Sequence, residues 1–275
     1  MLARDVLNIS RMNKLESLKK LILGPGSNED IFLAPHSDDI CFSLSHLAKI
    51  RGAGTLLTIF PISQYSTDQT FGNPIDIEQI TRKRLSEDTA FTALCGLTPG
   101  YLNFHDSSAR AELPFDARYA YKLADKIQVD LIRALMRPRI AQASKPKYWL
   151  FCPSAIGSHV DHAAVLLTIV RNLHLLRMHY RVAFYEDLHY ASNPIFRAIG
   201  LNILEKLLRG YKLEYFCMKL NNEAQKSKMQ AVNLYASQLT PKISSIKSYT
   251  PANPDFVLPH EALWLFQDEK LHELG

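Results

Sequence analysis

Short apolar runs alternate with helix-length stretches along most of this sequence of 275 residues. Strands are predicted at 31–34, 55–60, 101–104, 148–152 and 182–185. Helices are predicted at 10–22, 39–50, 77–95, 118–136 and 161–179. Parallel neighbouring strands need a long crossover connection, and helices between the strands supply it. The pattern therefore predicts an α/β fold with a Rossmann-like, mainly parallel sheet and helices on both faces.

The domain organisation follows from the same pattern. We expect a single domain over residues 1–275, with a core at about 28–190 that holds the polar motifs described below. An irregular C-terminal extension is expected at about 191–275, because four prolines interrupt it: Pro241, Pro251, Pro254 and Pro259. Residues 61–76 are polar and contain Pro61, Gly72 and Pro74, which predicts a long loop, and such loops are often functional.

Composition excludes several classes of protein. The apolar fraction of 47% and the charged fraction of 21% are ordinary for a globular chain. The net charge is +5, but the basic residues are scattered, so no nucleic-acid partner is expected. No apolar run is long enough for a membrane span and no signal-peptide core is present, so we expect a cytoplasmic protein without a membrane partner. The four cysteines form no metal-binding or redox pair in sequence.

Two turns between a predicted strand and a predicted helix carry unusual polar clusters. The first holds His36, Asp38 and Asp39, and the second holds His159, Asp161 and His162. Turns that follow parallel strands meet at one edge of the sheet, so these side chains should share a cleft. Histidine and carboxylate groups suit a catalytic metal ion, which keeps three protein ligands and one open position for water. Zn²⁺ is expected, with Fe²⁺ or another divalent metal as alternatives.

These motifs resemble those of the LmbE-like, or PIG-L, de-N-acetylases. The segment PHSDD at 35–39 is similar to the first motif of that family, and HVDH at 159–162 is similar to the second. Between them, RLSE at 84–87 and Asp106 match further family positions, and FYED at 184–187 looks like a segment of one bacterial subgroup. The resemblance covers about residues 31–190. Ser37 and Ile40 depart from the family pattern, which has proline and an acid at these places.

The resemblance implies roles for individual residues. The metal ligands would be His36, Asp39 and His162, and Asp38 would be the general base that deprotonates the attacking water. His159 would stabilise the oxyanion and protonate the leaving amine. Asp161 would hold one of the histidine rings, and Arg84 and Asp106 would bind the substrate.

Purely structural roles are alternatives for some of these residues. Asp38 is also a residue type that caps helix N-termini, and Arg84 and Glu87 are spaced for an ion pair on one helix face. Asp106 is equally suited to a turn with the serines that follow it. Glu186 and Asp187 are interpreted as structural.

The resemblance implies a metal-dependent amidase that removes an acetyl group from the 2-amino group of an N-acetylglucosaminyl small-molecule conjugate. The conjugate would be a thiol precursor, an antibiotic intermediate or an oligosaccharide. The sequence does not decide whether the protein forms a homo-oligomer. The alternative is a catalytically weak, carbohydrate-binding protein of the same fold. A nucleotide-binding module is disfavoured, because the sequence has no glycine-rich phosphate motif.

Overall fold

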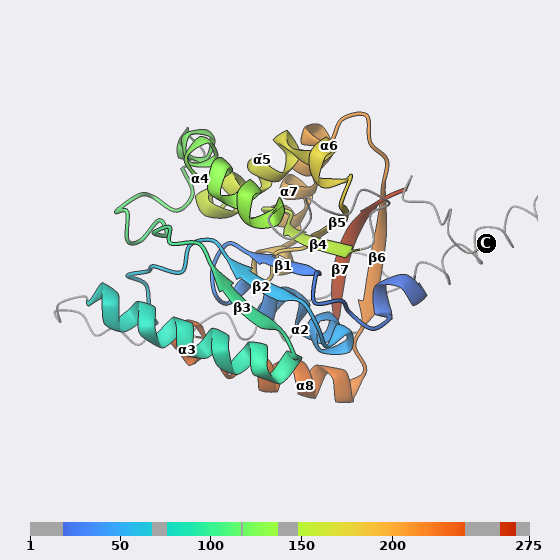
Figure 1. Cartoon of the computed structure of the whole chain (residues 1–275), viewed down its shortest axis with the longest axis horizontal. Helices are drawn as coiled ribbons and strands as arrows, with labels where there is room; N and C mark the ends of the chain where they lie inside the picture. The colour runs from blue at the N-terminus through green and yellow to red at the C-terminus, as the bar shows by residue number, and fades with distance from the viewer. Residues whose placement is uncertain (1–18, 68–75, 117, 137–147, 240–258, 268–275) are drawn as a thin grey trace, which may run out of the picture.

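Seven strands form one twisted sheet in the computed structural model, which describes residues 19–67, 76–116, 118–136, 148–239 and 259–267 (Figure 1). The strands run in the spatial order β3-β2-β1-β4-β5-β7-β6. They are β1 (Ile31–Ala34), β2 (Thr55–Thr58), β3 (Thr98–Tyr101), β4 (Tyr148–Pro153), β5 (Tyr180–Tyr185), β6 (Leu213–Lys219) and β7 (His260–Phe266). The first five strands are parallel, whereas β7 runs antiparallel to both β5 and β6.

Helices cover both faces of the sheet. Helices α2 (Asp39–Arg51), α3 (Ile77–Cys95) and α8 (Asn222–Val232) lie on one face in Figure 1, and α4 (Arg118–Met136), α5 (Val160–Arg171), α6 (Leu173–Leu176) and α7 (Pro194–Leu207) lie on the other. Alternate residues of β1 enter two separate cores: Phe32 packs with the first group and Leu33 with the second. The predicted α/β fold with a doubly covered, mainly parallel sheet is confirmed.

Several predicted elements have the predicted bounds. The helices at 77–95 and 118–136 and the strand at 31–34 are confirmed exactly. The strand predicted at 101–104 instead spans Thr98–Tyr101. Pro99 and Gly100 argue against a central strand, but β3 lies at the edge of the sheet, where a missing N–H is tolerated.

The long helix predicted at 161–179 is wrong in its second half. Helix α5 ends at Arg171, because Asn172 leaves the helical region with φ −108° and ψ 15°. The short helix α6 follows, and β5 already begins at Tyr180, where it pairs with Tyr148 of β4. The helical pattern of the sequence does not reveal this break, because the residues after Asn172 remain apolar.

The irregular C-terminal extension expected from residue 191 is also corrected. Its described residues hold α7, β6, α8, β7 and the short 3₁₀ helix η2 (Ala236–Gln238). Three of the four prolines that suggested irregularity, at 241, 251 and 254, lie outside the described residues. The proline at 194 begins α7, where it is favoured because its missing N–H would have no helical partner.

Two other expectations touch residues outside the description. The predicted helix at 10–22 is described only from residue 19, and the loop at 61–76 is described only at 61–67 and 76. Within the described ranges, no helix combines the length and apolar character needed to cross a membrane.

Candidate metal centre and active site

The two polar turns meet where the strand order reverses. Strand β1 has β2 on one side and β4 on the other, so the chain leaves β1 and β4 toward opposite faces of the sheet. The crevice between such neighbouring strands is the usual site of an open α/β sheet. The turn at 35–38 follows β1, and the turn at 154–159 follows β4. The topology therefore explains why residues more than a hundred positions apart share one site.

Three histidine rings converge in this crevice. One nitrogen from each of His36, His159 and His162 lies within 4.8 Å of the others. His162 Nε2 is 3.2 Å from His36 Nδ1. The Asp39 carboxylate completes the group, with Oδ1 3.3 Å from His162 Nε2 and Oδ2 3.6 Å from His36 Nδ1.

These spacings test whether the site suits a metal ion. Two ligand atoms at about 2.1 Å from a tetrahedral ion lie about 3.4 Å apart. The distances between the ligand atoms of His36, Asp39 and His162 run from 3.2 to 3.6 Å. The three predicted ligands therefore have the chemistry and the spacing of a zinc-like centre, and His159 adds a fourth nitrogen nearby.

A second layer of carboxylates orients two of the rings. Asp161 Oδ2 lies 2.8 Å from His36 Nε2, and Asp187 Oδ1 lies 2.7 Å from His162 Nδ1. Each contact directs the other ring nitrogen toward the shared centre, as carboxylates do for metal-bound histidines. Asp187 is itself fixed, because Oδ2 accepts hydrogen bonds from Ser154 Oγ and the Ile156 amide.

The charges around the site favour a cation. Burial opposes a charge on His162, but the carboxylates of Asp39 and Asp187 raise the pKa of its imidazole to about 9. Burial likewise opposes ionisation of Asp161, yet His36, His159 and Arg110 lower the pKa of this carboxyl below its usual range. Binding of a divalent cation would displace the proton from His162 and take over its role as counter-charge.

Asp38 does not act as a helix cap. It occupies the N-cap position of α2, but its side chain makes no capping hydrogen bond. Its carboxylate instead faces the guanidinium of Arg84, with Oδ1 3.5 Å from Nη2. Both side chains are buried. The carboxylate is thus held beside the predicted metal ligands by a buried guanidinium rather than used as a helix cap.

The two predicted substrate-binding residues, Arg84 and Asp106, contact each other beside Asp38. Arg84 Nη1 is 3.5 Å from Asp106 Oδ2 and donates to Ser63 Oγ at 2.7 Å. Asp106 uses its other oxygen to shape the turn, accepting from Ser108 Oγ and the Ala109 amide. Arg84 is only 3% exposed and Asp106 only 4%. In this arrangement Arg84 faces both Asp38 and Asp106, and the expected contact of Arg84 and Asp106 with substrate hydroxyls stays a prediction.

The spacing of Arg84 and Glu87 does not give an ion pair between them. Glu87 accepts hydrogen bonds from the amide and hydroxyl of Ser237, far along the chain.

His159 begins α5 and has a defined tautomer when neutral. Its Nδ1 accepts a hydrogen bond from the Asp161 amide at 3.3 Å, so the ring proton lies on Nε2. Nε2 faces Ser107 Oγ at 3.4 Å. The side of the ring that carries the proton therefore faces Ser107 next to the histidine cluster.

Sequence reasoning missed two residues of this site. Asp187 was interpreted as structural, although a carboxylate directly after β5 lies at the same sheet edge as the two motifs. Arg110, which contacts Asp161 Oδ1 at 2.6 Å and stacks over Phe60, carries no signal in the sequence. Its role appears only when the loop after β3 folds onto the turn after β4.

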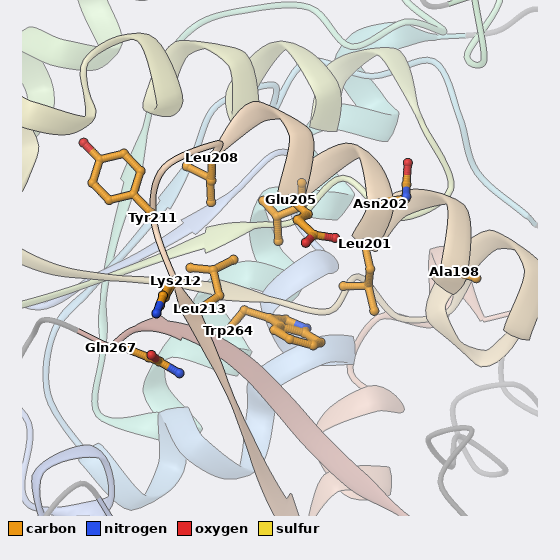
Figure 2. A pocket seen from close by; sticks show the side chains of 11 residues that line it. Ala198, Leu201, Asn202, Glu205, Leu208, Tyr211, Lys212, Leu213, Trp264 and Gln267 are labelled. Atoms are coloured by element: carbon orange, nitrogen blue, oxygen red, sulfur yellow. The ribbon is translucent and has the colours of Figure 1, made fainter.

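A separate pocket of about 550 Å³ lies between α7 and the strands β6 and β7 (Figure 2). Trp264 lies on its floor and is held by a hydrogen bond from Nε1 to Glu186 Oε1. None of the predicted catalytic or metal-binding residues lines this pocket. The candidate active site is therefore identified by its chemistry and not by the volume of a cavity.

The sequence matches no family model and no curated protein. Solved structures do match. A deacetylase–teicoplanin complex from teicoplanin biosynthesis is 19% identical, covers 87% of this chain and 99% of its own, and has a TM-score of 0.62. The deacetylase of the A40926 pseudoaglycone is 20% identical, with coverages of 87% and 98% and a TM-score of 0.59. A zinc-inhibited form of teicoplanin deacetylase gives 19% identity and a TM-score of 0.61. The chain therefore has the fold of the LmbE-like deacetylases, which its two motifs led us to expect.

Proposed function

We propose that this protein is a metal-dependent hydrolase that removes an acetyl group from the 2-amino group of an N-acetylglucosaminyl conjugate. One observation carries the proposal. The predicted ligands His36, Asp39 and His162 have ligand atoms 3.2–3.6 Å apart, and both Asp38 and His159 lie beside them. A protein that only bound carbohydrate would not need this combination of ligands, base and acid.

The metal site would be formed by His36, Asp39 and His162. A divalent ion held there would polarise the amide carbonyl and increase the acidity of a water molecule. Asp38 takes the proton of the attacking water as its oxygen bonds to the carbonyl carbon. Arg84 keeps the Asp38 carboxylate in place before the reaction.

His159 acts on the other half of the reaction. In its protonated form it donates to the oxygen that becomes negative when water adds to the amide. When the carbon–nitrogen bond breaks, it gives a proton to the nitrogen, so the products are acetate and a free amine. Asp161 holds His36 and stabilises positive charge on the neighbouring rings.

The substrate class is proposed from two sources. The motifs resemble those of enzymes that act on N-acetylglucosaminyl groups. The solved structures that share the fold are described as deacetylases for teicoplanin and for the A40926 pseudoaglycone. We therefore propose a small-molecule conjugate from antibiotic or thiol biosynthesis, with no nucleic acid or membrane as substrate.

The test joins metal content with acetate release. The purified protein is analysed by elemental mass spectrometry, stripped with a chelator and reloaded separately with Zn²⁺, Fe²⁺, Co²⁺ or Mn²⁺. Acetate release is then measured on a panel of N-acetylglucosaminyl compounds, with the Asp38→Asn variant as the matched control. Zinc is also added in excess, because one structure with this fold is a zinc-inhibited form.

We expect about one metal ion per chain and acetate release that disappears in the Asp38→Asn variant. Carbohydrate binding without acetate release under every metal would favour the carbohydrate-binding alternative. A protein that binds no metal would refute the proposal.

A further inference from the structure

The short helix η2 connects the C-terminal part of the chain to α3. Glu87 of α3 accepts two hydrogen bonds from Ser237, one from the backbone amide at 2.9 Å and one from the hydroxyl at 2.7 Å. Both residues are buried. Arg84 lies three residues before Glu87 on the same helix, where the two positions are neighbours. One side of α3 therefore contacts both η2 and Asp38, the predicted general base.

Helix η2 also holds the loop that follows β2, of which residues 61–67 are described. The carbonyl oxygen of Ser237 accepts hydrogen bonds from the Thr67 amide at 2.8 Å and from the Thr67 hydroxyl at 3.0 Å. The side chain of Gln238 donates to the Tyr65 carbonyl at 3.3 Å. Loop 61–67 is therefore fixed to the same helix that Glu87 holds.

This loop carries the closest partner of the Arg84 guanidinium. Ser63 Oγ accepts a hydrogen bond from Arg84 Nη1 at 2.7 Å. The carboxylates of Asp38 and Asp106 lie 3.5 Å from the same guanidinium. Arg84 Nε is buried and has no hydrogen-bond partner among the described residues. A shift of loop 61–67 would therefore change how Arg84 faces Asp38.

We propose that Glu87 and Ser237 are positioning residues for the general base. They hold loop 61–67 in place, so that the Ser63 hydroxyl orients the guanidinium that faces Asp38. This inference rests on the proposed deacetylase function, in which Asp38 takes the proton of the attacking water. Neither positioning residue is assigned a contact with the reacting atoms. Their contribution is geometric, and a displacement of about 1 Å at a reacting group can lower a rate about 100-fold.

The experiment compares wild type with Glu87→Ala and Glu87→Gln. Alanine removes both hydrogen bonds to Ser237. Glutamine removes the charge but still bonds both groups, because its carbonyl accepts from the amide and its NH₂ group donates to the hydroxyl oxygen. That oxygen already accepts from Gln238 Nε2 and has a second lone pair. We expect kcat for acetate release to fall about 10-fold in Glu87→Ala with metal content unchanged, and to recover largely in Glu87→Gln.

Two further variants test the route of this effect. Ser63→Ala removes the closest partner of Arg84. If Glu87 acts through Ser63, adding Glu87→Ala to Ser63→Ala should lower kcat little further. Asn221→Ala is the control, because it removes a hydrogen bond to the Ala224 amide at the start of α8, in the same C-terminal part of the chain. It should keep the wild-type kcat.

A second readout does not depend on turnover. Amide hydrogen exchange of loop 61–67 is measured by mass spectrometry in wild type and in each variant. We expect faster exchange in Glu87→Ala, including at the Thr67 amide, and wild-type exchange in Asn221→Ala. Unchanged exchange in Glu87→Ala would show that this contact does not hold the loop, and it would overturn the inference.

The outcomes separate the two proposals. If wild type releases no acetate from any substrate, the proposed function fails and the inference fails with it. If wild type is active and Glu87→Ala has wild-type kcat, the inference fails while the function stands. Additive effects of Glu87→Ala and Ser63→Ala would also overturn it, because Glu87 would then act by another route. A Glu87→Gln variant as slow as Glu87→Ala would overturn it too, because the charge would then matter rather than the hydrogen bonds.

Discussion

Asp88 is a buried carboxyl beneath the active site whose ionisation should weaken the fold. Its side chain is fully buried in α3, where Oδ1 accepts from the Tyr235 hydroxyl and Oδ2 from Thr58 Oγ1. Burial raises the pKa of this carboxyl from 3.8 to about 7, although the two hydroxyl donors and the nearby charge of Arg84 act in the opposite direction.

The sign and size of the effect follow from proton linkage. Between about pH 4 and pH 7 the folded state holds a proton on Asp88 that the unfolded state has lost, so stability falls as the pH rises. The shift from 3.8 to about 7 destabilises the fold by about 2 kcal/mol at pH 5 and about 4 kcal/mol at pH 8. Asp88→Asn keeps the shape of the side chain and removes this dependence.

Urea denaturation at about pH 5 and about pH 8 measures the effect. We expect the free energy of unfolding of Asp88→Asn, relative to wild type, to rise by about 2–3 kcal/mol between these two pH values. Asp130→Asn, which removes a half-exposed carboxylate paired with Arg133, should show no comparable change. A relative stability of Asp88→Asn that is equal at both pH values would refute the reasoning, because the carboxyl would then titrate normally in the folded protein.

Three further predictions concern the active site. His162→Ala should abolish stoichiometric metal binding, measured by elemental analysis, and full metal occupancy would show that the ligand assignment is wrong. Asp38→Asn should retain the metal and lower kcat by about 10²–10⁴-fold, and near-normal turnover would assign the base to another group, such as Asp161. His159→Ala should lower kcat strongly with the metal retained, and it should flatten the basic limb of a bell-shaped pH–rate profile. If that bell keeps its shape at lower amplitude, a different acid protonates the leaving amine.

The regular elements before residue 190 could be predicted mainly because their signals are local. The helix at 77–95 is closed by Gly96, whose φ of 71° is a conformation that glycine adopts easily. The short apolar run at 31–34 predicts a buried strand, because it is too short for a helix and follows a turn with glycine and proline. Errors arose where local signals were weak or misleading, as at the edge strand β3 and at the break after Arg171.

The convergence of the predicted metal ligands could also be predicted, because each motif is short and follows a strand. PHSDD and HVDH each place their histidines and carboxylates within one turn, and the rule for parallel sheets brings the two turns together. The expected pairing of Asp161 with a histidine has its counterpart in the 2.8 Å contact to His36. Their catalytic roles remain predictions until the variants are measured.

Only the tertiary structure decided what surrounds these motifs. Asp187 reaches His162, Arg110 reaches Asp161, and the ring of Tyr190 fills the space above Gly157. Each contact joins segments that are 25 or more residues apart. The sequence of one segment does not indicate which residue of the other segment it will contact. The sequence by itself therefore determined most strands and helices before residue 190 and the two polar turns, because those depend on neighbouring residues. The orientation of the rings and the burial of Arg84 beside Asp38 depend on packing between distant segments, which only the folded chain defines.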